Sequence, residues 1–144
     1  MKKLVLMVTL LLAAGCEQPV YEGELLLRKG VFYKPNETTG FTGVHRTSYG
    51  SGQLRAEATF KNGTGEGPFK MWYENGQLQL EATFKNGKEE GLARWWHENG
   101  QLKEEITYKN HKEEGLARAW DENGQDTAEY CYSKGEQVDM SNCR

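Results

Sequence analysis

The dipeptide Gly-Gln recurs every 24 residues along this chain, beginning at Gly52, Gly76, Gly100 and Gly124. Between these glycines, three blocks align without a gap, and they cover residues 52–75, 76–99 and 100–123. A constant period of this length is typical of a repeat array, in which each unit buries its apolar surface against its neighbours. A chain of 144 residues is therefore expected to form one folded array.

Each block predicts a β-hairpin. Apolar and polar residues alternate through the first half of the second block, with the apolar ones at Leu78, Leu80, Ala82 and Phe84. This alternation is the period of a half-buried strand. Asn86 and Gly87 mark a turn because both tolerate positive φ, and a second short strand begins at Gly91. Turns this short make neighbouring strands antiparallel, so the predicted fold is all-β, an elongated single-layer antiparallel β-meander of 24-residue hairpins.

Both ends of the array are predicted to be degenerate repeats, at residues 31–51 and 124–144. In the downstream copy, Asp126 stands where the full repeats carry Leu. The repeat domain is thus expected to span residues 31–144, after a tether over residues 16–30.

One hairpin turn departs from the others. His111 stands where the two preceding repeats carry Gly63 and Gly87. Because a turn of this kind favours glycine, the third turn is expected to be strained or different.

The first residues predict a cleaved lipoprotein signal peptide over residues 1–15. Lys2 and Lys3 precede a short apolar run, and the letters AAGC follow at residues 13–16. The apolar run is too short to span a bilayer. This pattern resembles a bacterial lipobox, in which the thiol of Cys16 takes a lipid. The alternative is an ordinary cysteine beside a simple signal cleavage site.

The predicted location is the bacterial cell envelope, with the chain anchored by lipid. In a double-membraned cell the outer membrane is favoured, because residue 17 is Glu and not the Asp that resembles an inner-membrane retention signal. After cleavage before Cys16, 16 basic residues would face 21 acidic ones, a net charge of −5. This balance argues against nucleic acid as a partner, since phosphate binding requires clustered Lys and Arg. The predicted contact with the membrane is therefore the covalent lipid on Cys16.

The two remaining cysteines, Cys131 and Cys143, form an even pair in an exported chain. Such pairs are usually bonded, and the letters SKGE at residues 133–136 offer a turn that would bring them together. The alternative is two free thiols. No other Cys or His at metal-ligand spacing accompanies them, so no metal site is predicted.

The tryptophans at the repeat period are one candidate binding face: Trp72, Trp96 and Trp120. Equivalent residues two strands apart are separated by roughly 10 Å along one face. In one register this column faces the same way as the leucines at Leu54, Leu78 and Leu102; in a register shifted by one residue, Met71 and Trp95 take its place. The column is either the core of a curled sheet or a partly open apolar groove that takes a partner.

Charged residues recur with the same period. Glu57, Glu81 and Glu105 are expected to form a column on a solvated polar face, away from the tryptophans. The basic residues Lys70, Arg94 and Arg118 are expected to lay their stems over the aromatic face, and they belong to the candidate binding face.

No catalytic residue is predicted. His45, His97 and His111 lie at unrelated positions of the repeat, so they are not expected to converge. A repeated column of carboxylates has equal environments, whereas acid/base catalysis requires unequal ones. Neither a nucleophile elbow, nor a phosphate loop, nor an H-E-x-x-H motif is present. No cofactor is predicted either.

The letters FKNGKEEGLARWWHENGQL and YKNHKEEGLARAWDENGQ resemble the bacterial MORN-repeat variant. The resemblance covers residues 31 to 135 and implies tandem hairpins joined by a Tyr/Trp-Glu-Asn-Gly-Gln segment. Members are often labelled YwqK-type antitoxins, and the eukaryotic MORN proteins are similar to scaffolds and membrane-linking modules.

The expected function is a lipid-anchored, non-enzymatic binding or scaffold module at the cell envelope, acting on an unidentified protein partner through one face of its sheet. The alternative is an immunity or antitoxin-type protein that caps a toxic partner in the same compartment. A hydrolase is the remote third class.

Overall fold

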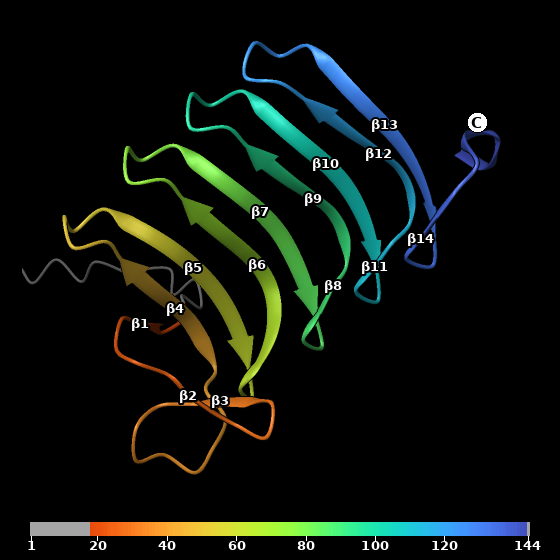
Figure 1. Cartoon of the computed structure of the whole chain (residues 1–144). Helices are drawn as coiled ribbons and strands as arrows, with labels where there is room; N and C mark the ends of the chain where they lie inside the picture. The colour runs from red at the N-terminus through yellow and green to blue at the C-terminus, as the bar shows by residue number, and fades with distance from the viewer. Residues whose placement is uncertain (1–17, 144) are drawn as a thin grey trace, which may run out of the picture.

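The computed structural model describes residues 18–143. Cys16 and the expected signal peptide lie outside the described residues. The described chain is all-β apart from one short 3-10 turn, and its main sheet has 12 strands (Figure 1). The strands are β1 (Val20–Tyr21), β2 (Leu26–Arg28), β3 (Val31–Tyr33), β4 (Gly43–Ser48), β5 (Leu54–Lys61), β6 (Thr64–Trp72), β7 (Leu78–Lys85), β8 (Lys88–Glu89), β9 (Gly91–Trp96), β10 (Leu102–Lys109), β11 (Lys112–Glu113), β12 (Gly115–Trp120), β13 (Asp126–Ser133) and β14 (Glu136–Val138), followed by the turn η1 (Met140–Cys143).

The strands that follow β4 lie side by side and antiparallel in the order β4-β5-β6-β7-β9-β10-β12-β13-β14, while the short strands β8 and β11 pair with β7 and β10. The predicted meander of hairpin repeats is therefore confirmed. The segment expected to be a tether differs, because it contains two short strands. There, β1 pairs in parallel with β4, and β2 forms a separate two-stranded hairpin with β3.

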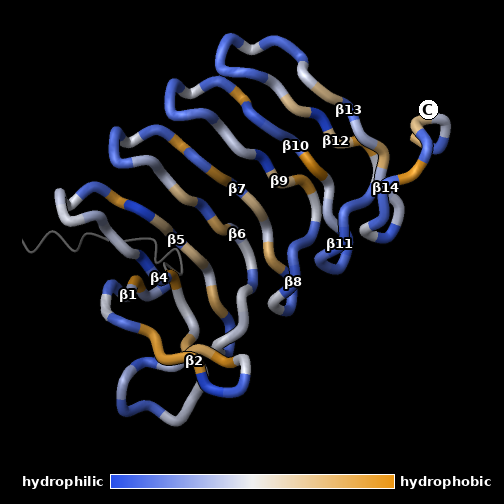
Figure 2. Tube along the Cα trace, in the orientation of Figure 1, coloured by the Kyte–Doolittle hydropathy of each residue, from blue (hydrophilic) through white to orange (hydrophobic). Residues whose placement is uncertain are grey.

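Polar loops and apolar strands alternate along the chain. Figure 2 shows hydrophilic loops at the ends of the hairpins and hydrophobic stretches within the strands and around β2. At one end of the sheet lie the tight turns within the repeats, and at the other lie the joins, which contain the repeated Glu-Asn-Gly-Gln letters.

The third tight turn has the same backbone shape as the others. Asn86 and Gly87 have φ of 51° and 75°, and Asn110 and His111 have φ of 52° and 66°. Of the two expected outcomes, the turn at His111 is therefore the strained one. Its backbone matches that of the other turns, and a residue with a Cβ atom occupies the left-handed conformation that glycine adopts more readily.

A bulge bends the second strand of each hairpin. In the second repeat, Glu81 pairs with Arg94 and Phe84 with Glu89, so two residues on β7 face four on the partner. Gly91 has φ of 85°, a conformation that suits glycine. The amide of Glu90 donates to the carbonyl of Thr83 at 2.9 Å, which satisfies one backbone group that the bulge would otherwise leave unpaired.

A second bulge, next to each join, decides which side chains share a face. Met71 lies opposite Leu80, but Trp72 lies opposite Leu78, so Gln79 is an extra residue on β7. A bulge reverses the alternation of the strand beyond it. As a result, Leu78 and Leu80 lie on opposite faces, although the alternation in the sequence assigned them to one.

The core is a row of small side chains on one face, which we call the alanine face. Ala93 and Ala117 are each 1% exposed and Ala82 is 6% exposed, although the sheet is a single layer here. Larger side chains on the neighbouring positions of the same face, such as Trp95 and Tyr108, flank the row. The alanine face is defined by its central row, Ala58, Phe69, Ala82, Ala93, Ile106 and Ala117.

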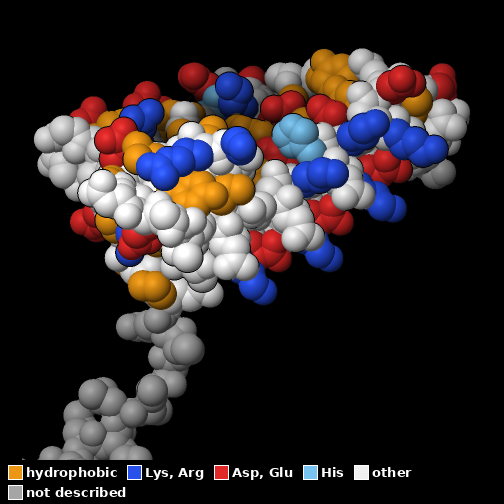
Figure 3. Space-filling model, turned by 90° about the horizontal axis from the view of Figure 1, so that it is seen from below, with side chains coloured by type: hydrophobic (Ala, Val, Ile, Leu, Met, Phe, Trp, Pro, Cys, Tyr) orange, Lys and Arg blue, Asp and Glu red, His pale blue; other side chains and the backbone are white. Residues whose placement is uncertain are grey.

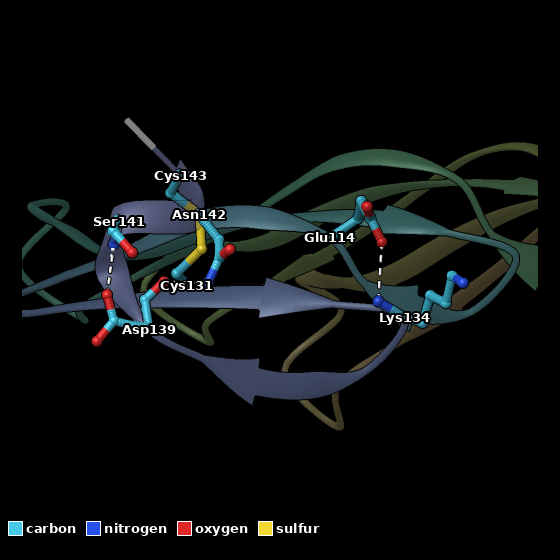
Figure 4. The surroundings of a disulfide bond; sticks show 7 residues. All are labelled: Glu114, Cys131, Lys134, Asp139, Ser141, Asn142 and Cys143. Atoms are coloured by element: carbon cyan, nitrogen blue, oxygen red, sulfur yellow. Dashed lines mark hydrogen bonds between the residues drawn. A yellow bond between two sulfur atoms is a disulfide. The ribbon is translucent and has the colours of Figure 1, made fainter.

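The C-terminal end of the sheet is closed by a disulfide. After β14, the turn η1 brings Cys143 to Cys131, with Cα atoms 5.8 Å apart and the sulfur atoms bonded (Figure 4). Cys131 is 1% exposed. Asp139 accepts a hydrogen bond from the amide of Ser141 at 2.8 Å. Together these contacts attach the last residues to the end of the array.

Candidate functional site

The face opposite the alanine face carries a continuous row of alternating charges. Each of the eight longer strands β4–β7, β9, β10, β12 and β13 contributes one charged residue, and residues on neighbouring strands are directly opposite each other. We call this surface the ladder face. Its row, in strand order, consists of Arg46, Glu57, Lys70, Glu81, Arg94, Glu105, Arg118 and Glu129.

Close ion pairs connect much of this row. Arg46 Nε donates to Glu57 at 2.7 Å, and Arg118 Nε donates to Glu129 at 3.1 Å. Arg94 bridges two carboxylates, at 3.1 Å to Glu105 and 3.4 Å to Glu81. The hydrogen bond that Arg94 donates to Glu105 raises the pKa of Arg94 further above its ordinary value. The side chains are partly solvated, so each pair contributes only about 0.2–1 kcal/mol to stability.

The glutamates and the basic residues were expected on different faces, and this expectation was wrong. Glu81 and Arg94 are register partners and share the ladder face. Each basic residue lies on a strand between two strands that carry carboxylates, so neighbouring members of the row attract each other across the strands. The bulge beside the join is the physical reason, because it reverses the alternation on which the expectation rested.

The predicted tryptophan column also lies on the ladder face. Trp72 is two residues from Lys70 on β6 and directly opposite Leu78, and Trp96 is opposite Leu102. All are half-buried. We call this set the Trp-Leu band, and its members are Leu54, Trp72, Leu78, Trp96, Leu102 and Trp120.

The tryptophan column is therefore not the core of the sheet. Within the repeats, the buried side chains lie in the alanine row on the other face, which also carries Met71 and Trp95. Of the two registers considered, the structure adopts the one in which the tryptophans and leucines face the same way. The alanine row was not predicted because the alternation in the sequence placed Ala82 on one face with Leu78, and the bulge at Gln79 puts them on opposite faces.

The joins are held by hydrogen bonds from each repeat to the next. The hydroxyl of Tyr73 donates to the carbonyl of Trp96 at 2.7 Å, and His97 Nε2 lies 2.9 Å from the carbonyl of Trp120. Because a carbonyl can only accept, the proton resides on Nε2 of His97. Histidine thus replaces the tyrosine of the two preceding joins and makes the same contact.

The asparagine of each join makes two further bonds. Asn99 Nδ2 donates to the carbonyl of Glu122 at 2.7 Å, and Asn99 Oδ1 accepts from the amide of Gln101 at 2.9 Å. Asn75 makes the equivalent pair. In the last join Asn123 stands at this position, but the amide of Gln125 donates to Asp121 Oδ1 at 2.9 Å instead, and this hydrogen bond lowers the pKa of Asp121. The repeated Glu-Asn-Gly-Gln letters are explained by this stacking of joins.

At the other end of the sheet, carboxylates bind the backbone of the tight turns. Glu66 accepts from the amide of Asn86 at 2.7 Å, and Glu90 accepts from the amide of Asn110 at 2.9 Å. Glu114 repeats the contact with the amide of Lys134. These glutamates stabilise the array, since each connects two successive hairpins.

The alanine face is hollowed near the N-terminus. Two adjoining hollows of about 330 and 570 Å³ lie between the β2–β3 hairpin and strands β4 to β7. A smaller one of about 200 Å³ lies beside Met71, Leu80 and Trp95. The sequence analysis did not identify these hollows.

The remaining candidate residues lie apart. His45 Nε2 contacts the carbonyl of Gly23 at 2.9 Å, and His111 Nδ1 is 2.9 Å from Glu89. Within residues 18–143, no three His, Cys, Asp or Glu side chains gather as metal ligands would. The described part of the chain also contains no helix long and apolar enough to cross a bilayer.

The repeated sequence of this chain resembles a known repeat. Three segments of the chain match the MORN repeat variant. They are residues 41–62, 65–86 and 89–110. Neither the curated proteins nor the solved structures gave a match to the chain.

Each matched segment of the MORN repeat variant spans a join. Residues 65–86 contain most of β6, the join and all of β7, so the matched unit pairs the last strand of one hairpin with the first strand of the next. Strands β12 and β13 repeat this arrangement beyond the matched residues. Residues 41–110 thus carry repeats of the MORN variant within one β-sheet, and the array extends past the segments that match.

Proposed function

We propose that this MORN-repeat scaffold is a lipid-anchored protein of the bacterial cell envelope that binds a protein partner on its ladder face and catalyses no reaction. The observation that carries the proposal is the register. It brings the Trp-Leu band and the basic residues Lys70, Arg94 and Arg118 onto one face with the same spacing.

The composition of this face supports binding. Tryptophan and arginine dominate the energy of many protein interfaces. The tryptophans are half-buried, so each presents apolar surface without being the core. A partner with an alternating arrangement of charge would complement the ladder row.

Neighbouring tryptophans give a matched test, because Trp95 and Trp96 are consecutive and lie on opposite faces. The Trp96→Ala variant should lose recovery of partners from an envelope extract, whereas Trp95→Ala should keep it in protein that remains folded by its thermal midpoint. Equal loss of recovery in both folded variants would contradict the assignment of the ladder face.

The anchor is tested separately. The Cys16→Ala variant should lose palmitate labelling and be released from membranes, with its fold unchanged. Continued retention on membranes without label would refute a lipid on Cys16 and leave the binding face untouched.

A further inference from the structure

The hollows at the N-terminal end of the alanine face form one elongated site. The hollows of about 330 and 570 Å³ share four lining residues, Phe32, Ala58, Phe60 and Phe69. Phe32 comes from the β2–β3 hairpin and the other three from β5 and β6. The β2–β3 hairpin therefore forms one wall and the sheet forms the other. Figure 3 is seen from the side of this hairpin and shows apolar side chains next to Lys and Arg there.

One end of the site is apolar. The residues that line the smaller hollow include Phe84 and several glycines but no charged side chain. Phe32 and Phe60 have ring centroids 5.1 Å apart, and Phe69 and Phe84 have centroids 5.8 Å apart with nearly perpendicular planes. Pockets lined by aromatic side chains with few polar groups take apolar ligand groups.

The other end is acidic. Glu22 and Glu24 line the larger hollow, and both are exposed at its rim. Among the ion pairs of residues 18–143, neither carboxylate takes part in one. Two carboxylates without a cationic partner favour a cation that arrives with the ligand.

The sequence departs from its repeat where the site is formed. Phe69 stands where the next two repeats carry Ala93 and Ala117, and Gly65 stands where they carry Glu89 and Glu113. The exchange adds an aromatic wall and removes a charged side chain. In the later repeats the corresponding alanines are 1% exposed, so the surface is closed there.

We propose that this site binds an extended segment of a partner polypeptide in which basic side chains lie next to an aromatic or aliphatic one. The basic groups contact Glu22 and Glu24, and the apolar side chain packs against Phe69 and Phe84 at the apolar end of the site. From β4 to β7 the site crosses three strand spacings of ~4.8 Å, which corresponds to a segment of about four or five extended residues.

The probe is the capped, fluorescently labelled pentapeptide Lys-Lys-Gly-Phe-Leu, and its binding to the full chain in phosphatidylcholine nanodiscs is measured by anisotropy, with empty nanodiscs as the blank. Two related peptides separate the contributions, Glu-Glu-Gly-Phe-Leu and Lys-Lys-Gly-Ser-Ser. Each should bind at least tenfold more weakly than the probe. No binding of the probe, or equal binding of all three peptides, would overturn the proposal.

Variants of the protein localise the binding. The Gly65→Gln change fills the apolar end, and the fold should tolerate it because Gly65 is not among the glycines with positive φ and its added Cβ would lie 3.5 Å from the nearest atom. Gly65→Gln and Phe69→Ala should each weaken the probe at least tenfold. The double change Glu22→Gln and Glu24→Gln should weaken it several-fold and reduce the salt dependence of binding.

The control is Glu98→Gln, which removes an exposed charge at a join, away from the site. It should bind the probe as the parent does. If Phe69→Ala lowers the thermal midpoint, the binding of the probe to Gly65→Gln protein alone tests the proposal. Unchanged binding in folded Gly65→Gln protein would show that the probe binds elsewhere and would overturn the proposal.

Discussion

At the scale of single residues, the clearest strain in the array is at His111. It has φ of 66° in a turn where the two preceding repeats have glycine. A residue with a Cβ atom in this conformation costs roughly 1–2 kcal/mol. The contact with Glu89 at 2.9 Å is solvent-exposed on the histidine side and recovers only part of that cost.

The variant His111→Gly should therefore be more stable, by about 1 kcal/mol in the free energy of unfolding. Urea denaturation with the disulfide intact measures the change. The reverse substitution, Gly87→His, should destabilise by at least as much, because its Cβ would also come within 3.1 Å of Thr64. A lower urea midpoint for His111→Gly would mean that the ion pair outweighs the backbone strain.

The ionisation of Tyr108 should change the free energy of unfolding at high pH. Burial, together with the nearby charges of Glu89 and Glu113, raises its pKa to about 12. The folded state thus favours the neutral phenol, so its contribution is fully present below the ordinary pKa of about 10 and is lost as the pH rises from there to about 12.

Urea midpoints of the parent chain should consequently fall more steeply above pH 10 than those of Tyr108→Phe, which cannot ionise there. The comparison removes the effect of the other tyrosines, since both proteins contain them. Parallel curves for the two proteins would show that Tyr108 ionises equally in the folded and unfolded states.

At the scale of elements, the join couples one hairpin to the next more closely than any single ion pair of the ladder row does. Asn99 donates to the carbonyl of Glu122 in the next join and accepts from the amide of Gln101 in its own join. Loss of both hydrogen bonds in Asn99→Ala should cost about 1–3 kcal/mol. Thermal and urea unfolding measure it.

A matched control lies beside Asn99. The side chain of Glu98 forms no hydrogen bond or ion pair with the described residues, so Glu98→Ala should change stability by less than about 0.5 kcal/mol. Comparable losses in the two variants would indicate that the join responds to any substitution and not to the bonds of Asn99.

The elements also show what could be predicted from the sequence. Strands and tight turns followed from alternation and from Asn-Gly pairs, because these reflect local backbone preferences. The faces did not follow, since one extra residue at Gln79 moves Leu78 away from Leu80 without interrupting the alternation. Strands β1 and β2 were missed because they are short and belong to no repeat.

Among the candidate sites, too, local patterns could be predicted from the sequence and tertiary contacts could not. Trp72 and Lys70 recur with the repeat and were identified, although the residues around them were assigned to the wrong face. The N-terminal hollow depends on contacts between β2–β3 and the sheet, which no local pattern encodes. The only sign of this hollow in the sequence was that Phe69 and Gly65 stand where the later repeats carry alanine and glutamate.

At the scale of the whole molecule, the array should tolerate the loss of one complete repeat. Deletion of residues 76–99 joins Asn75 to Gly100 and so restores an intact Glu-Asn-Gly-Gln join. The deletion removes one acidic and one basic member of the ladder row, so Lys70 would then lie opposite Glu105 and the alternation of charge would persist. Each hairpin contacts chiefly its neighbours, which allows the remaining ones to close the gap.

Deletion of residues 76–87 tests whether the hairpin is truly the unit of folding. It removes β7 and places β6 directly before β8 and β9. In the sheet, β6 and β9 run in the same direction, because each is antiparallel to β7. A short join can connect antiparallel strands but not parallel ones, and the new neighbours Lys70 and Arg94 would bring like charges together. The longer deletion should therefore unfold cooperatively with a strand-rich circular dichroism spectrum, while the shorter one should aggregate or show no cooperative transition. If both deletions folded equally well, single strands and not hairpins would be the units of this array.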